Sequence, residues 1–484
     1  MTTLREKTIT GMFWAGIGKF GAVGLSFVSN MVLARLLIPA DFGCIAMLQI
    51  FIAVATVLVY SGFGSALVQK KEPTHIDFTS VFYFNLAASF LLVGVLHLCA
   101  PAVSRFYGMP ELAKVLRVQS WVLVIQGFSI VQSSQLQKQL RFKELSIRNI
   151  IATFVGMVVA IGMALMHCGV WSLVVSQLLT ALTSVLLLWK MSEWRPTLEF
   201  SFAALRELFL FGGLMALSSL VETLYTNLQG LIIGKLYSPT DLGHYSQARK
   251  LESVPTESLS QVVNQVSFPV FSAMQEDPAR LLSAVRRNIK AITYLNFPLM
   301  ALLIAIAHPL ISLLYGARWE VAAPYFQILC VSSMIYTLNT LNTNVIKSLG
   351  KSNIFFFIQL TKRLIGIGLI FLGVRFGIYG LLWAVASVGY ICFIINAIVN
   401  KKLINYGIWS QVKDVGFCYL LAALIAVAVY FGGQLLPWHP YWVMIVQIVA
   451  YALLYWLASV VFKMEGYETY KGILVEKIKG KLSN

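Results

Sequence analysis

Long apolar segments joined by short polar connections are the feature that most constrains this chain. Of its 484 residues, 58% are hydrophobic and only 12% are charged, whereas soluble domains carry about 25% charged residues. An apolar helix of about 20 residues spans a bilayer. Division of the segments at glycine, proline and charge clusters predicts about fourteen helices, at residues 9–36, 40–68, 77–104, 112–136, 149–167, 170–189, 205–234, 241–274, 288–314, 320–346, 353–374, 377–399, 412–435 and 440–462.

The sequence therefore predicts an all-α, polytopic membrane protein of about fourteen transmembrane helices. The connections are too short to hold a soluble catalytic domain. No Walker A loop, H-E-x-x-H, G-x-S-x-G or dinucleotide-binding motif is present in the sequence. The six cysteines and six histidines are scattered without metal-ligand or disulfide spacing. We expect neither an enzyme nor a metal site.

The basic residues predict an orientation. With the N-terminus placed in the cytoplasm, the inner segments hold 25 of the 37 lysines and arginines and the outer segments hold 7. This asymmetry is the positive-inside pattern, and it predicts that both termini are cytoplasmic. The net charge of +17 thus reflects topology, and a nucleic-acid partner is not expected.

An internal repeat predicts the domain organisation. The segment "ARLLIPADFG" at residues 34–43 returns as "GKLYSPTDLG" at residues 234–243, so that Pro39, Asp41 and Gly43 align with Pro239, Asp241 and Gly243. Proline and aspartate suit the first turn of a helix. The offset of 200 predicts an N-terminal lobe at 1–200 and a C-terminal lobe at 201–402, related as parallel repeats. Helices 13 and 14 then occupy 403–463, and 464–484 form a cytoplasmic interfacial tail.

Lys19 lies in the middle of the first apolar segment, with no further charge before Arg35. A lysine near the bilayer midplane costs roughly 2.5–3.5 kcal/mol. To remain charged at that depth it must face water or an anionic ligand. A phosphate or pyrophosphate is a natural partner for such a compact cation.

Helix 241–274 is the most polar of the predicted spans, because it contains Arg249, Lys250, Glu252 and Glu257. Pro255 and Pro269 are expected to kink it. Glu222, in the preceding helix, is predicted to lie at a depth where it can pair with Arg249 or Lys250. Two interpretations stay open: the charges neutralise one another within the C-terminal half, or some line a water-filled cavity. Lys362 and Arg363 have no acidic residue in their own helix, and they either snorkel to the inner surface or join that cavity.

Several segments resemble the polysaccharide-transport, or Wzx-type, flippases of the multidrug/oligosaccharidyl-lipid/polysaccharide (MOP) exporter superfamily. They include "SGFGSALVQKKE" at 61–72, "QSSQLQKQLRFKEL" at 132–145, "GVWSLVVSQ" at 169–177, "VSFPVFSAMQED" at 266–277, "LISLLYGARWEVAAPYFQIL" at 310–329 and "IKSLGKSN" at 346–353. Their order, together with the twelve-plus-two helix layout, carries the resemblance, which covers about residues 5–400.

The resemblance implies two six-helix lobes that alternate access and flip a polyprenyl-pyrophosphate-linked oligosaccharide to the outer leaflet of a bacterial inner membrane. It implies a cationic cavity for the pyrophosphate, to which Lys19, Arg249, Lys250, Lys362 and Arg363 correspond by placement. Glu222, Glu252 and Glu257 are candidates for cavity pairing or for coupling to a proton or sodium gradient, and no cofactor is expected. Membrane lipids, polysaccharide polymerases and glycosyltransferases are the implied partners.

Three rival interpretations remain. A cation-coupled multidrug antiporter of the MATE type relies on a carboxylate in the N-terminal lobe, where the first helix here has a lysine. A flippase for the peptidoglycan precursor would use the same physics on another substrate. A membrane scaffold for glycan assembly, without transport, is disfavoured by unpaired charge and a proline-containing polar helix.

Overall fold

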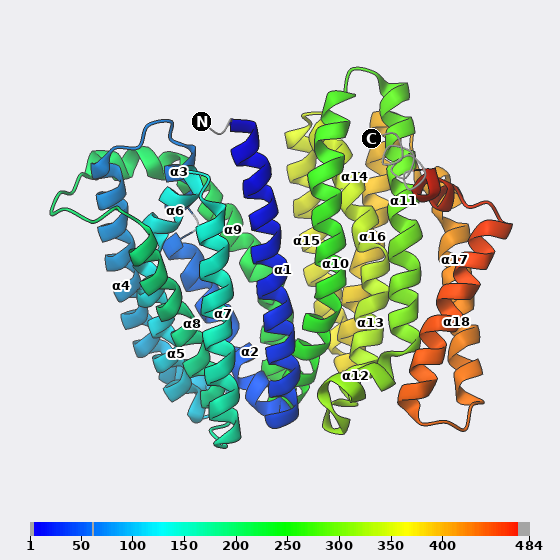
Figure 1. Ribbon diagram of the computed structural model, residues 1–484, viewed down its shortest axis with the longest axis horizontal. Coiled ribbons are helices and arrows are strands. Elements are labelled where there is room, and N and C mark those ends of the chain that lie inside the picture. The colour runs from blue at the N-terminus through cyan, green and yellow to red at the C-terminus, as the bar shows by residue number, and fades with distance from the viewer. Residues whose placement is uncertain (1–3, 61, 473–484) are drawn as a thin grey trace. The chain divides into compact units, whose positions relative to one another are not determined.

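The computed structural model describes residues 4–60 and 62–472, and every regular element within these ranges is a helix. By their contacts the residues fall into two compact units, 1–246 and 247–484. Figure 1 shows that both units are bundles of long helices. The sequence repeat predicts a lobe boundary between residues 200 and 201, whereas the contacts divide the chain after residue 246. The lobe boundary stays a prediction, because contacts do not test the repeat.

Unit 1 is a bundle in which α1 packs along α7, α7 along α8, α4 along α5 and α2 along α9. Its helices are α1 (Leu4–Leu36), α2 (Pro39–Tyr60), α3 (Phe63–Gln69), α4 (His75–Tyr107), α5 (Glu111–Gly127), α6 (Ile130–Lys138), α7 (Phe142–Leu165), α8 (Val170–Met191), α9 (Phe202–Leu236) and the first turns of α10 (Pro239–Ala273).

Unit 2 contains the rest of α10 and a bundle in which α15 packs along α16, α11 along α13 and α17, and α13 and α14 along α16. Its helices are α11 (Pro278–Ala305), α12 (Ala307–Tyr315), the short 3-10 helix η1 (Ala317–Trp319), α13 (Ala322–Met334), α14 (Tyr336–Ser348), α15 (Ser352–Val374), α16 (Gly377–Ile404), α17 (Ile408–Gln434) and α18 (Pro440–Val461).

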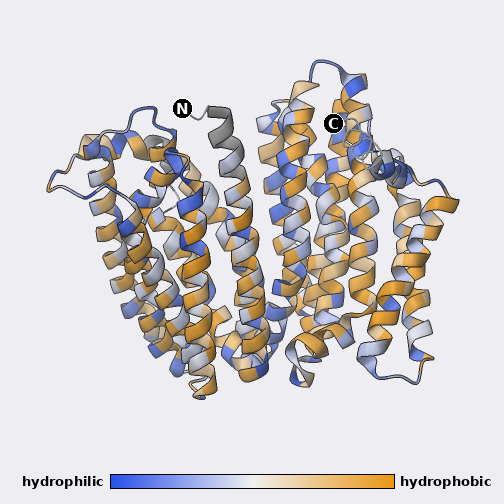
Figure 2. Ribbon diagram, in the orientation of Figure 1, coloured by the Kyte–Doolittle hydropathy of each residue, from blue (hydrophilic) through white to orange (hydrophobic). Residues whose placement is uncertain are grey.

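The helices are those of a multi-pass membrane protein. Figure 2 shows hydrophobic residues along the middle of the helices and hydrophilic residues gathered at their ends and in the loops. Within the described ranges, ten helices are long and apolar enough to cross a membrane, or up to 11 if the bent pair α5–α6 is one span. Each of the fourteen predicted segments coincides with a helix or a consecutive pair of helices, but fourteen membrane crossings are not confirmed.

Four of the predicted segments are broken into two helices, and side chains from other helices account for three of these breaks. The indole of Trp189 donates to the carbonyl of Phe128 between α5 and α6 (2.8 Å). The amide of Asn296 donates to the carbonyls of Ser333 and Met334 where α13 ends (3.1 and 2.7 Å). Gln327 donates to the carbonyl of Ile304 where α11 ends (3.0 Å). Each side chain thus supplies a hydrogen-bond donor to a carbonyl at a helix end.

The repeated segments form equivalent helix starts, as their proline and aspartate predict. Helix α2 begins at Pro39 and α10 begins at Pro239. Asp41 accepts a hydrogen bond from the backbone N–H of Ile38 (3.2 Å). Asp241 accepts one from the N–H of Ser238 (3.3 Å) and a second from its hydroxyl (2.7 Å). In both copies the carboxylate therefore lies near the positive end of the helix dipole.

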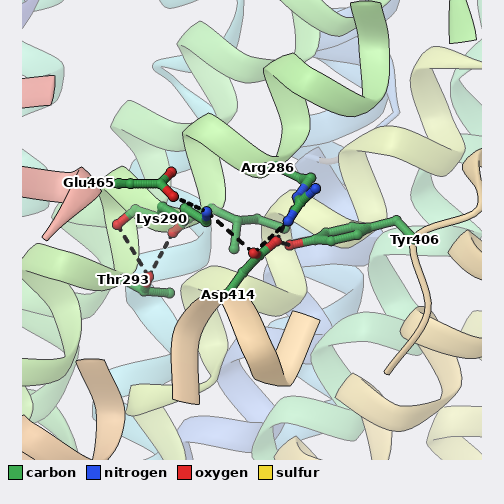
Figure 3. Close-up of polar contacts among 7 residues, drawn as sticks. Arg286, Lys290, Thr293, Tyr406, Asp414 and Glu465 are labelled. Carbon is green, nitrogen blue, oxygen red and sulfur yellow. Dashed lines mark hydrogen bonds and ion pairs between the residues drawn. The ribbon is translucent and has the colours of Figure 1, made fainter. Parts of the chain in front are cut away.

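A buried carboxylate anchors α17 to the bundle of unit 2. Asp414 accepts two hydrogen bonds from Arg286 of α11, both 2.7 Å long, and a third from the hydroxyl of Tyr406 (2.8 Å). The ammonium of Lys290 lies 3.3 Å from Asp414 and 2.6 Å from Glu465 (Figure 3). Burial, reinforced by Asp414, raises the pKa of the Tyr406 hydroxyl, so Tyr406 stays a hydrogen-bond donor.

Residues 464–472 are the described part of the predicted interfacial tail, and 465–472 within it are helical. This helical segment packs on α11, where the hydroxyl of Tyr470 donates to the carbonyl of Ala291 (3.2 Å). The apolar face predicted for this tail, at Ile473, Leu474, Ile478 and Leu482, lies outside the described residues.

Candidate functional site

The interior of unit 1 contains a polar cavity of about 610 Å³ between α2, α5, α7 and α8. Helix α8 lines it with Ser176, Thr180 and Ser184, which are spaced four residues apart and therefore share one helix face. Of the 17 lining residues, eleven are polar, six are apolar and none is charged. The lining residues themselves therefore offer hydrogen bonds and carry no charge.

Four of the eleven polar lining residues are amides, and the other seven carry hydroxyls. Gln177 lines the cavity, and its Oε1 atom accepts a hydrogen bond from the buried Gln119 (3.0 Å). Gln49 and Gln126 also line it. Because an amide offers both a donor and an acceptor, this wall suits a ligand or water that does the same.

A second cavity of about 570 Å³ lies within unit 1 beside α3 and α6, where Ser65, Gln69, Ser134 and Gln137 contribute to its lining. Arg148 of α7 joins the walls of the two cavities. Its guanidinium donates to Ser133 in the wall of the second cavity (3.0 Å) and to Asn149 in the wall of the first (2.5 and 3.1 Å). No carboxylate of the described chain lies within 4.0 Å of this guanidinium.

Two of the predicted site residues lie in unit 1, and both are exposed. Lys19 is on α1, and Glu222 is on α9. Lys19 is not among the residues that line the cavities of unit 1. The pairing predicted between Glu222 and Arg249 or Lys250 joins the two units, and it stays a prediction.

In unit 2, α10 turns its charged residues in different directions. Glu252 is buried, at 5% exposure, whereas Arg249, Lys250 and Glu257 are exposed. The Oε1 atom of Glu252 accepts hydrogen bonds from the hydroxyls of Thr256 (2.8 Å) and Ser333. Two hydroxyl donors on one oxygen compensate part of the cost of burying this carboxyl group. Helix α10 continues through Pro255 and Pro269 as one helix.

Lys362 lies in the interior of unit 2, at 8% exposure, and its neighbour Arg363 is half-buried. The ammonium of Lys362 donates to Oδ1 of Asn396 on α16 (2.6 Å). Asn396 in turn donates to Oδ1 of Asn339 on α14 (2.9 Å). Lys362 is therefore held by a chain of amides from two neighbouring helices.

The structure thus brings together two sets of predicted residues with partners that the sequence did not single out: Glu252 with Thr256 and Ser333, and Lys362 with Asn396. Within the described ranges no group of three histidine, cysteine, aspartate or glutamate side chains is arranged to hold a metal ion. Binding of pyrophosphate or of a coupling ion by the predicted residues stays a prediction.

Residues 32–324, more than half of the chain, match the family described as "Polysaccharide biosynthesis protein". The chain belongs to this family. The family resemblance predicted from the sequence is therefore confirmed.

Curated relatives are similar to this chain over most of their length. The succinoglycan biosynthesis transport protein ExoT of Rhizobium meliloti is 28% identical over 80% of each chain. The lipopolysaccharide biosynthesis protein WzxC of Escherichia coli is 24% identical over 77% of this chain and 76% of its own.

Solved structures agree on the fold. An inward closed conformation of the lipid II flippase MurJ matches with a TM-score of 0.76 and 14% identity, over 93% of this chain and 98% of that one. An inward-facing MATE multidrug transporter of the MOP superfamily matches with a TM-score of 0.59 and 15% identity, over 81% and 98%. The chain therefore shares the all-α fold of these two structures.

The sequence analysis did not predict the polar cavity of unit 1. The site was predicted from charged residues, and the cavity has none in its lining. A signal was present, because Ser176, Thr180 and Ser184 recur every four residues in a mostly apolar segment. Such a polar row on one face of a membrane helix marks a protein-facing or cavity-facing surface.

Proposed function

We propose that this protein is a flippase that moves a polyprenyl-pyrophosphate-linked oligosaccharide from the inner to the outer leaflet of a bacterial inner membrane, by alternating access. The observation that carries this proposal is the family match, since curated relatives are named for the transport and synthesis of surface polysaccharides. The polar interiors of both units support it, because a membrane protein keeps such groups where water or a polar substrate passes. Both termini are proposed to be cytoplasmic.

The basic residues would receive the pyrophosphate. Lys19 and the pair Arg249 and Lys250 are exposed cations on helices, and ammonium and guanidinium groups bind phosphate oxygens through charge-assisted hydrogen bonds. Lys362 and Arg363 complete the proposed set. The lipid tail would remain in the bilayer while the head group crosses.

Glu252 is our leading candidate for ion coupling. It is a buried carboxyl group held by two hydroxyls, and such a group can exchange a proton as its surroundings open to water. Glu222 and Glu257 are exposed and are proposed as secondary candidates. Sodium is the alternative coupling ion. No cofactor or catalytic step is part of the proposal.

The test is leaflet-specific movement of a labelled undecaprenyl-pyrophosphate oligosaccharide in liposomes that contain the purified protein. We expect transport by the unaltered chain and a strong loss in Lys19→Gln. Lys114→Gln is the matched control, because Lys114 is an exposed lysine at the start of α5. Normal transport by Lys19→Gln would remove Lys19 from the site but would leave the flippase proposal standing.

No transport by the unaltered protein, with proton and sodium gradients of both signs, would refute the flippase proposal. Efflux of a cationic drug in the same liposomes would then favour the MATE-type antiporter. Retained association with polysaccharide polymerases or glycosyltransferases, without any transport, would favour the scaffold.

A further inference from the structure

A pocket of about 760 Å³ lies in unit 2 between the first turns of α11 and the chain segment that follows α18. Its charged lining residues are Arg286, Arg287, Lys290, Lys463, Glu465 and Glu468. The pocket shares no residue with the cavities of unit 1 or with the basic residues proposed for the pyrophosphate. Because cations outnumber carboxylates in the lining, the pocket favours an anionic ligand.

Two of the four cations are engaged by a buried carboxylate of the protein itself. Asp414 lies 2.7 Å from Arg286 and 3.3 Å from Lys290 (Figure 3). Arg287 and Lys463 are exposed, and no carboxylate in the described ranges lies within 4.0 Å of either side chain. These two cations are therefore available to a ligand in the pocket.

The carboxylates limit the charge that such a ligand can carry. Glu465 lies 2.6 Å from Lys290, whereas Glu468 is exposed and forms no ion pair in the described ranges. With Asp414 included, three carboxylates oppose the four cations of the lining, which leaves one positive charge without compensation. A monoanionic phosphodiester matches this excess. A pyrophosphate diester carries two negative charges and would meet repulsion from Glu468.

The position of the pocket places its ligand at a membrane surface. Helix α18, which ends at Val461, is long and apolar enough to cross a membrane, and Lys463 follows it after one residue. That residue, Phe462, is 58% exposed, and its ring centroid lies 5.1 Å from that of the exposed Phe417. An apolar surface beside a basic pocket suits a molecule that joins acyl chains to an anionic head group.

The segment that follows α18 forms a wall of the pocket because it is docked on α11. Gly466 is buried, and a methyl group at this position would overlap the side chain of Tyr294. The hydroxyl of Tyr470 donates to the carbonyl of Ala291 (3.2 Å). The two walls are therefore held against each other, and a phosphate in the pocket would be shared between them.

We propose that this pocket binds the phosphodiester head group of an anionic membrane phospholipid through Arg287 and Lys463. Guanidinium and ammonium groups form charge-assisted hydrogen bonds with phosphate oxygens, and basic pockets beside membrane helices bind anionic head groups. The inference goes beyond the proposed function, since this phospholipid is a component of the surrounding membrane and not the transported substrate.

The test is native mass spectrometry of the delipidated full-length protein, titrated with phosphatidylglycerol or with phosphatidylcholine, which has no net charge. The variants are Arg287→Gln and Lys463→Gln. Their matched controls are Arg280→Gln and Lys471→Gln, at exposed cations of the same two segments that do not line the pocket. The controls lose the same charge, so they measure the general attraction of anionic lipid to a basic surface.

We expect phosphatidylglycerol to bind more tightly than phosphatidylcholine. Each pocket variant should weaken its binding by roughly 5- to 10-fold, between the effects of an exposed ion pair and of a hydrogen bond to a charged group. The controls should leave binding nearly unchanged, and Glu468→Gln should tighten it. Equal weakening in pocket variants and controls, or no preference between the two lipids, would overturn the site.

Two further ligands separate the possible sources of phosphate. Inorganic phosphate should not displace phosphatidylglycerol, because it lacks acyl chains, and displacement would overturn the assignment to a lipid. Binding of undecaprenyl pyrophosphate should be the same in Arg287→Gln as in the unaltered protein, and its loss would assign the pocket to the transported substrate instead. Lys463→Arg keeps the charge and should retain phosphatidylglycerol. Equal thermal midpoints of the variants exclude a folding defect.

Discussion

Gly43 and Gly243, the last residues of the two repeated segments, make reciprocal contacts in unit 1. A methyl group at Gly43 would overlap the carbonyl oxygen of Pro239, and a methyl group at Gly243 would overlap the carbonyl oxygen of Pro39. The start of each helix, α2 or α10, thus packs directly against the backbone of the other copy. The aligned glycines are explained by this close approach rather than by a turn conformation, since both lie within helices.

Substitution of either glycine by alanine should therefore destabilise the protein. Overlap with a backbone carbonyl cannot be relieved by a rotamer change, so we expect Gly43→Ala and Gly243→Ala each to cost about 1–3 kcal/mol. The control is Gly162→Ala on α7, where a methyl group would meet no atom within 4 Å and alanine should be tolerated. Thermal midpoints from loss of the monodisperse chromatographic peak provide the measurement. Equal midpoints for all three variants would contradict the close contact.

Asn396 should contribute to stability chiefly by accepting the hydrogen bond from Lys362. The variant Asn396→Leu deprives a buried ammonium of its acceptor at 2.6 Å, and we expect a loss of about 1.5–3 kcal/mol in stability. Lys362→Met should be milder, because it removes the charge together with its need for a partner, and the double variant should be more stable than Asn396→Leu alone. A double-mutant cycle on thermal midpoints measures this coupling.

The same lysine variant tests the proposed pyrophosphate site. If Lys362 receives the pyrophosphate, Lys362→Met should fold normally and transport the lipid-linked glycan at a reduced rate. Full transport with unchanged stability would assign Lys362 no part in binding. Asn353→Leu, at an exposed asparagine near the start of the same helix, controls for the general effect of removing an amide.

Hydropathy predicted the helices well, because twenty apolar residues have few alternatives to a membrane helix. It missed the breaks, since a break depends on side chains that arrive from elsewhere in the chain. Nothing in the sequence around Met334 indicates that Asn296 donates to its carbonyl. The charges Glu252 and Lys362 were identified from sequence, but their partners Ser333 and Asn396 are 81 and 34 residues away. Such partners follow from packing and cannot be derived from local pattern.

Glu252→Gln should abolish the coupling of transport to a proton gradient and leave the stability of the protein nearly unchanged. Glutamine keeps an oxygen that can accept the hydrogen bonds of Thr256 and Ser333, so we expect stability to change by less than about 1 kcal/mol. The variant cannot release or bind a proton, and gradient-driven transport should fall to the rate seen without a gradient. The rate is measured in liposomes with and without an imposed pH difference. Retained acceleration by the gradient would remove Glu252 as the proton carrier.

Asp414 should be the most sensitive residue for the attachment of α17. Its carboxylate is 4% exposed and contacts both Arg286 and Lys290. Asp414→Asn removes the negative charge and leaves two cations facing each other, so we expect a loss of about 1.5–3 kcal/mol, the range for hydrogen bonds to charged groups. In Asp414→Asn the backbone amides at the start of α17 should exchange hydrogen faster than in the unaltered protein, and this increase should exceed that in α13.

The matched control for this prediction is Glu276→Gln, at an exposed carboxylate in the turn that precedes α11. It removes the same charge from the same end of the bundle without breaking the contact between α11 and α17. Because Arg286 is half-exposed whereas Asp414 is buried, Arg286→Gln should cost less than Asp414→Asn: the freed carboxylate keeps Lys290 and Tyr406. Equal protection of α17 in Asp414→Asn and Glu276→Gln would show that apolar packing against α11 alone holds this helix in place.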